Sequence, residues 1–259
     1  MRSTILILGL SIFLVLSTTG SSLTFAGSLL KKEVVPGEDI YHEITVRLSG
    51  DEFPMEAVGG LYGHGMGLDG ARIPREDTDE MKPYSAVGFL KLTPERAQIE
   101  VGKPAVFVLE GKVPEDVGSG GRYALVEIHT PPQGEGQVGV ALATIAPIML
   151  TISGTELVET GEITDLTVSA DEVLVIFKNT GNHHFRASAE ATLLNDQGEI
   201  IASTEAPLTY NSLIPTTSWL FEMSFDLEED LAPGTYTVEA TVTHEDGTVL
   251  DTEETTFEV

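Results

Sequence analysis

The sequence contains no cysteine among its 259 residues. This absence excludes disulfide bonds, thiolate metal sites and a lipoprotein anchor together. For an exported chain, it also argues against a eukaryotic ectodomain stabilised by disulfides. The stability of the folded protein must therefore come from apolar cores and hydrogen bonds.

Basic residues are scarce as well. Lys and Arg number 14 against 41 Asp and Glu, which gives a formal net charge of −27. A surface of this charge repels phosphate backbones and anionic membranes, so nucleic acid is excluded as a partner. Two interpretations of the acidity stay open: a solvated surface suited to a salty medium, or a role in binding cations.

The arrangements of residues that perform covalent catalysis are also missing. There is no Gly-x-Ser-x-Gly motif and no serine set among His and Asp as in a catalytic triad. Paired carboxylates for glycoside hydrolysis stay open in so acidic a chain. However, the one tryptophan, Trp219, shares strand parity with Phe221 and Met223, which predicts a core position rather than an exposed sugar platform. We therefore expect a protein that is not an enzyme.

The one long apolar run lies at the N-terminus, over Thr4–Leu16 after a positive start. It is shorter than the roughly 20 residues that a membrane span needs. Thr24 and Ala26 place small residues at the −3 and −1 positions of a cut after Ala26, so residues 1–26 are predicted to be a secretory signal peptide. An uncleaved anchor extended through Phe25 is the alternative. The protein is expected to be secreted or held at the cell surface, with no other membrane span.

One supersecondary unit occurs twice, over residues 91–130 and 219–243. Each copy has a strand, a turn rich in Pro, Asp and Gly, and a returning strand. A glycine precedes a tyrosine by two residues in both copies, as Gly121 with Tyr123 and Gly234 with Tyr236. A tyrosine that opens a strand after such a turn is typical of the tyrosine corner of immunoglobulin-like sandwiches. The predicted fold is all-β, with two immunoglobulin-like β-sandwich domains at residues 27–153 and 154–259.

The first domain is expected to contain strands with one buried face, interrupted by a long irregular segment. Gly59–Lys82 contains a glycine-rich stretch and an acidic run, and connections of this length are more often functional or mobile than neutral. We expect this segment to be mobile in the free protein and to be ordered by a partner or by Ca²⁺. Val138–Ile152 is predicted to close the domain as an exposed apolar edge strand.

The second domain is predicted to have seven strands, the number found in the simple immunoglobulin-like sandwich. Turns are predicted at residues 195–198 and 245–247, where Asn or Asp and Gly adopt a positive φ at little energetic cost. The expected strands are Ile163–Val168, Val173–Lys178, Phe185–Leu194, Glu199–Thr204, Ser218–Leu227, Thr235–Thr243 and Val249–Phe257.

The metal-site candidates are weak. Hard oxygen ligands for Ca²⁺ occur together in the acidic run, although the spacing is not that of an EF-hand loop. His64 and Met66 could offer imidazole and thioether to copper, but a second such pair is missing. His183 and His184 are neighbours that would point to opposite faces of a strand, so they are not expected to share one ion. No cofactor is therefore expected, with Ca²⁺ kept open on four carboxylates: Glu76, Asp77, Asp79 and Glu80.

The stretches LTPERAQIEVGKPAVFVLEGKVPEDVGSGGRYALVEIHT and VLVIFKNTGNHHFRASAEATLLNDQGEII, followed by LIPTTS and LAPGTYTVEATV, resemble PapD-like sandwich domains. These occur in periplasmic pilus chaperones and in related exported proteins of archaea and Gram-positive bacteria. The resemblance implies an exported protein of two sandwiches. The basic residues with which pilus chaperones hold a subunit's C-terminus have no matching motif here, and Arg47 and Lys112 are candidates by location alone.

Three functions follow from these observations. The first is a non-enzymatic secreted or cell-surface module that binds other extracellular, envelope or pilus-like proteins. The second is a pilus-type assembly chaperone that donates a strand to an incomplete partner. The third is a Ca²⁺-dependent or glycan-binding surface module that uses the Gly59–Lys82 segment.

Overall fold

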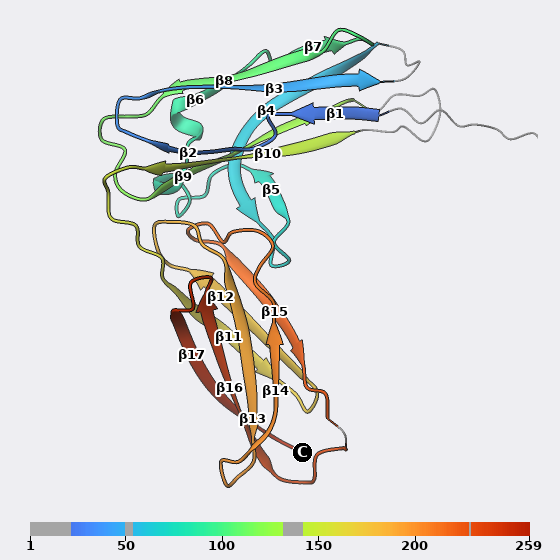
Figure 1. Ribbon diagram of the computed structural model, residues 1–259, viewed down its shortest axis with the longest axis vertical. Helices are drawn as coiled ribbons and strands as arrows, with labels where there is room; N and C mark the ends of the chain where they lie inside the picture. The colour runs from blue at the N-terminus through green and yellow to red at the C-terminus, as the bar shows by residue number, and fades with distance from the viewer. Residues whose placement is uncertain (1–21, 50–53, 132–141, 228) are drawn as a thin grey trace, which may run out of the picture.

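The computed structural model describes residues 22–49, 54–131, 142–227 and 229–259, and these form an all-β protein with two separate hydrophobic cores. Domain one contains strands β1 to β10, and domain two contains β11 to β17. In Figure 1 most strands of domain one lie across the long axis of the molecule, β4 and β5 descend toward domain two, and the strands of domain two run along the long axis. The predicted fold class is confirmed.

Domain one is a sandwich of two sheets. The first has the strand order β1-β3-β8-β6, with bounds Ser22–Ala26, Asp39–Ser49, Ala105–Lys112 and Leu90–Thr93. The second has the order β2-β10-β9-β4-β5, with bounds Leu30–Val34, Ala143–Ile152, Gly121–His129, Met55–Met66 and Arg72–Arg75; β7 (Arg96–Ile99) also pairs with β4. Two 3₁₀ turns, η1 (Lys82–Tyr84) and η2 (Val87–Phe89), precede β6.

Period two explains which side chains of β3 form the core. Ile40, Ile44, Val46 and Leu48 have the same parity, and all four are buried. They meet the inward residues of the opposite sheet, such as Ile148 of β10. Alternation of this kind is what a strand with one wet face requires.

The glycine-rich stretch forms a regular strand, so the prediction that this segment is irregular was wrong, while its ordering by a partner or by Ca²⁺ stays a prediction. Met55–Met66 forms β4, which pairs with β7, β9 and β5 in turn. Its glycines allow close packing: a Cβ on Gly59 would lie 2.8 Å from the Phe107 ring, and one on Gly60 would lie 2.5 Å from the Tyr62 ring. Side chains from neighbouring positions fill the space that glycine leaves, and the strand pairing offsets the entropy cost of ordering it.

Val138–Ile152 is not an edge strand throughout, which corrects a second prediction. Residues 138–141 lie outside the described part of the chain, and β10 lies between β2 and β9. However, β2 reaches only from Ile148 to Ile152 of β10. The first half of β10, Ala143–Pro147, therefore has β9 on one side and no strand of the described chain on the other.

Domain two is a sandwich of a three-stranded and a four-stranded sheet, with the seven strands that the sequence predicts. The first sheet has the order β11-β12-β15, with bounds Gly161–Val168, Glu172–Asn179 and Ser218–Ser224. The second has the order β14-β13-β16-β17, with bounds Ile200–Ala206, Ala187–Leu194, Thr235–His244 and Val249–Glu258. Both predicted turns are present, with Gly198 at φ 74° and Gly247 at φ 92°. No helix in the described part of the chain has the length and apolar character to cross a membrane.

Tyr236 makes the bond that a tyrosine corner requires. Its hydroxyl donates to the carbonyl of Ala232, four residues earlier, at 2.9 Å. The ring is buried in the core of domain two and stacks on Phe257. Gly234, between the acceptor and the tyrosine, pairs its backbone with Val259 at the C-terminal end of the chain.

We predict that Tyr236→Phe lowers the free energy of unfolding of domain two by about 1 kcal/mol, because the part-buried hydrogen bond to the Ala232 carbonyl is lost. Urea denaturation of the full chain measures the effect. Tyr41→Phe is the control, since Tyr41 is exposed and bonds only to the side chain of Glu43. Equal midpoints for wild type and Tyr236→Phe would remove the corner as a stabilising interaction.

Candidate functional site

The β4–β5 hairpin of domain one reaches across to domain two. The Leu220 amide in β15 donates to the Leu68 carbonyl at the hairpin tip at 2.9 Å. Asn211 donates to the Gly70 carbonyl at 3.0 Å and accepts from Arg72 at 2.6 Å, and the Tyr210 hydroxyl donates to the Asp69 carbonyl. The polar backbone of the turn is thus satisfied by domain two.

Gly70 lies against the ring of Trp219. A Cβ at this position would be 2.1 Å from the indole ring, and the residue has φ 77°, a conformation that favours glycine. Trp219 is buried as predicted, at 7% exposure, and its ring also makes an edge contact with Tyr210. The tryptophan therefore belongs to the core of domain two and to the contact between the domains.

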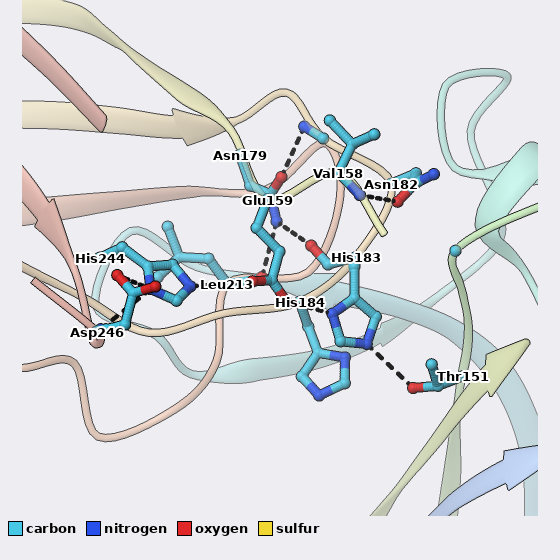
Figure 2. A network of polar contacts seen from close by, with 12 residues as sticks. Thr151, Val158, Glu159, Asn179, Asn182, His183, His184, Leu213, His244 and Asp246 are labelled. Carbon is cyan, nitrogen blue, oxygen red and sulfur yellow. Dashed lines mark hydrogen bonds and ion pairs between the residues drawn. The ribbon is translucent and has the colours of Figure 1, made fainter. Parts of the chain in front are cut away.

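A second contact between the domains joins β9 and β10 to a histidine-containing loop of domain two, and Figure 2 shows Thr151 of β10 beside His183 of this loop. The hydroxyl of Tyr123 lies 3.1 Å from His184 Nδ1, and the hydroxyl of Thr151 lies 3.0 Å from His183 Nε2. His183 Nδ1 is 2.6 Å from Glu159 Oε1. The two histidine rings are 4.2 Å apart, so the prediction that they point to opposite faces was wrong. They lie in a loop before β13, where strand alternation does not apply.

Domain two holds this loop rigidly through Asn179. Its side-chain amide donates to the carbonyls of His183 and Leu213 at 2.9 Å each, and its Oδ1 accepts from the Gly181 amide at 2.8 Å. Asn179 is fully buried. Every polar group of this side chain is therefore used to fix the loop that contacts domain one.

Tyr123 does not form a tyrosine corner in the way that the duplication suggested. Its hydroxyl bonds across the domain boundary rather than to its own turn. Its ring lies over Gly121, where a Cβ would be 1.9 Å from the hydroxyl oxygen. Residue 121 must therefore be glycine, because the ring of Tyr123 occupies the space that a side chain would fill.

Burial sets the protonation of this contact. It raises the pKa of Tyr123 well above its usual range, and it lowers the pKa of His184 to about 3, with nearby His183 adding to the effect. The Tyr123 hydroxyl therefore keeps its proton and shares a hydrogen bond with a neutral His184. His64 on β4 makes an edge contact with Tyr123, and burial lowers its pKa to about 3 as well.

The space beside Tyr123 is too small for a substrate. His64, Asp77 and Tyr84 line a cavity of about 10 Å³. Such a volume holds at most about one water molecule. His64 Nδ1 and Asp77 Oδ1 are buried here with no hydrogen-bond partner among the described residues. This cavity offers no room for a catalytic reaction on an organic molecule.

Of the predicted metal ligands, His64 and Asp77 line the same small cavity, but the others do not join them. Glu76, Asp79 and Glu80 are exposed, and the last two are paired with Lys82 and Lys178 respectively. Met66 packs against the core of domain two. Over residues 22–49, 54–131, 142–227 and 229–259, no cluster of three or more His, Asp or Glu side chains has the arrangement of a metal site.

The basic residues at the domain contact are not those suggested by location. Arg47 lies in β3 and Lys112 ends β8, both in the sheet of domain one that is remote from domain two. Lys31 of β2 instead stands in register with Met149, which is itself in register with Tyr123. Arg122 is buried and donates to the carbonyls of Ser119 and Gly121.

The open half of β10 presents its backbone in a defined direction. The Ile152 amide donates toward the β9 side, to Gly120, whereas the Ser153 amide donates toward the β2 side, to Val34. Backbone groups alternate along a strand, so the backbone N–H and C=O groups of Ile145 and the carbonyl of Pro147 face the β2 side, where no strand of the described chain lies beside them. Proline fits this edge because its missing N–H is not required there.

Comparison with known proteins gives structural likenesses alone. No protein-family model matches the sequence, and no curated protein matches it. Among solved structures, the chain is similar to the YadV chaperone (12% identity, TM-score 0.40, 92% of this chain and 99% of that one). It is also similar to the SafB chaperone solved in complex with the SafA pilin of Salmonella enterica (9%, TM-score 0.42, 93% and 99%) and to the class 5 fimbriae chaperone CfaA (9%, TM-score 0.41, 92% and 98%). At TM-scores below 0.5 we assign no function from these likenesses, and they give no support to an archaeal or Gram-positive type.

We predict that Gly70→Ala detaches the hairpin from domain two, because the added methyl group would overlap the ring of Trp219. The emission of Trp219, the one tryptophan, should shift to the red as the ring becomes solvated. Gly247→Ala is the control: it carries a similar backbone cost of about 1 kcal/mol, but nothing lies within 4 Å of its Cβ. An unshifted spectrum in Gly70→Ala would contradict the docking of the hairpin on this ring.

We predict that His184 makes the folded protein sensitive to acid. Its folded pKa of about 3 lies below the unfolded value near 6.5, so the unfolded chain binds the proton first and stability falls as the pH drops from about 6.5 toward 3. His184→Gln keeps a hydrogen-bonding group for Tyr123. Between pH 6.5 and 5, its free energy of unfolding should fall by about 1 to 2 kcal/mol less than that of wild type. Urea midpoints across this range test it, with His129→Gln, at the other end of β9, as the control. Parallel pH profiles for wild type and His184→Gln would refute it.

Proposed function

We propose that this chain is a non-enzymatic, exported envelope protein that binds an extended segment of another protein along the open half of β10. The observation that carries the proposal is the row of edge-facing backbone groups between Ala143 and Pro147, beside which β2 does not extend. A strand added there would continue the sheet by β-augmentation.

The backbone of β10 limits the geometry of the added strand. On the open edge, the amide of Ile145 is a donor, and the carbonyls of Ala143, Ile145 and Pro147 are acceptors. Pro147 contributes no donor, so pairing must centre on the residues before it. Ile145 is half-buried, and it offers apolar contact to a side chain of the partner.

The rigidity of the rest of β10 supports this role. Its second half is paired on both sides, by β2 and β9, and ends in the contact between Thr151 and His183. A fixed edge loses little conformational entropy when a partner strand is added. The net charge of −27 favours a partner that is neutral or basic over one that is acidic.

Two versions of this function differ in the state of the partner. In the first, the chain is a structural module that holds a flexible segment of a folded envelope protein. In the second, it is an assembly chaperone that donates β10 to a subunit whose own sheet lacks a strand. One of the similar structures is a chaperone solved with a pilin, which is true of that protein and motivates the second version here. A Ca²⁺-dependent or glycan-binding role has no comparable support, since the carboxylates of residues 76–80 do not converge.

We predict that Ile145→Pro abolishes partner binding while the fold is retained, because it removes an edge-facing N–H and leaves the pairing with β9 intact. Ile145→Ala is the matched control, since it loses the side chain but keeps the N–H. Each full-length variant is used to recover envelope proteins from native extract, and the bound proteins are quantified by mass spectrometry. Amide exchange in the complex should show new protection at Ile145 in wild type and in Ile145→Ala.

Recovery of the same proteins by Ile145→Pro at wild-type levels would rule out pairing at this edge. The protease sensitivity of the isolated partner distinguishes the two versions. A partner that is folded and protease-resistant by itself indicates the structural module. One that is protease-sensitive until bound indicates the chaperone.

A further inference from the structure

Strand β1 is an integral part of domain one, although it falls within the segment predicted to be removed as a signal peptide. Ser22–Ala26 pairs antiparallel with β3, from Ser22 opposite Ser49 to Ala26 opposite Thr45. Leu23 and Phe25 are half-buried and pack against the core, while Thr24 and Ala26 are exposed. This is the period-two pattern of a strand with one buried face.

Gly27 lies at the point where the chain passes from β1 in one sheet to β2 in the other. β1 pairs in the first sheet and β2 in the second, and Gly27 between them has φ 75°. A Cβ there would lie 2.1 Å from the carbonyl oxygen of Glu43, so no other residue fits. The angle φ of Gly27 is defined by the carbonyl carbon of Ala26, so a chain that began at Gly27 would have no φ at this position. The positive φ therefore calls for glycine only if Ala26 stays in the chain.

A cut after Ala26 would leave two defects in the folded domain. The backbone of β3 from Thr45 to Ser49 would lose its partner and become an open edge, which is a template for unwanted pairing. The part of the core beneath Leu23 and Phe25 would also become exposed to water. Neither defect arises if the segment is cut before Ser22.

We propose that the signal peptide is cleaved after Gly20, so that the mature protein begins at Ser21 and keeps β1. The inference rests on the export proposed above and concerns the position of the cut. The apolar run ends at Leu16, and Thr18 and Gly20 place small residues at the −3 and −1 positions. The cut itself lies outside the described residues, and β1 fixes the limit beyond which it must not fall.

The test is the N-terminal peptide of the full chain after export, identified by mass spectrometry, for wild type and two variants. Ala26→Phe blocks a cut after residue 26, and the exposed position of Ala26 means that the larger side chain does not disturb the core. Gly20→Phe blocks a cut after residue 20. We expect wild type and Ala26→Phe to begin at Ser21, and Gly20→Phe to lose that terminus.

A wild-type terminus at Gly27 that disappears in Ala26→Phe would overturn the proposal, as would a wild-type chain that retains Met1. In the exported protein, Phe25→Ala should also lower the urea midpoint, whereas Thr24→Ala should not. Fractionation of the same cells reports on export separately. Chain confined to the cytoplasm would contradict the proposed function, whereas exported chain with a terminus other than Ser21 would contradict the cleavage position alone.

Discussion

The packing of Gly70 on the ring of Trp219 is the constraint on which the arrangement of the two domains depends. It requires β4 to continue beyond its pairing with β9, turn without a side chain, and return as β5. The carbonyls of the turn then find donors in domain two, on Asn211, Tyr210 and the Leu220 amide. A bulkier residue at the tip would leave those carbonyls without partners and Trp219 without cover.

The strands that could be predicted from the sequence are those in which the alternation of apolar residues alone determines which side chains are buried. Alternation of apolar residues predicted all seven strands of domain two and the buried face of β3, because these strands have one core-facing side. It failed for β4, since glycines at 59, 60, 63 and 65 remove the side chains that would display the period. It also failed for Tyr123, because an identical Gly-x-Tyr spacing serves a corner in domain two and a bond to the other domain in domain one.

The candidate site was harder to predict than the fold because its members are distant in the sequence. Thr151, Glu159 and Asn179 carry no recognisable motif, and their roles depend on how one domain sits on the other. The open half of β10 was likewise hidden, since it depends on where β2 stops rather than on anything in β10 itself, although Pro147 is a residue that favours such an edge.

The two domains are joined by the covalent connection between β10 and β11, by the docked hairpin, and by the contact of β9 and β10 with the histidine-containing loop. The two non-covalent contacts are therefore intramolecular, and they operate at an effective concentration that the short connection keeps high, on the order of millimolar. Contacts too weak to hold two separate molecules together are then sufficient to keep the domains closed. A substitution at the hairpin tip is therefore expected to weaken this contact, while the covalent connection keeps the two domains near one another.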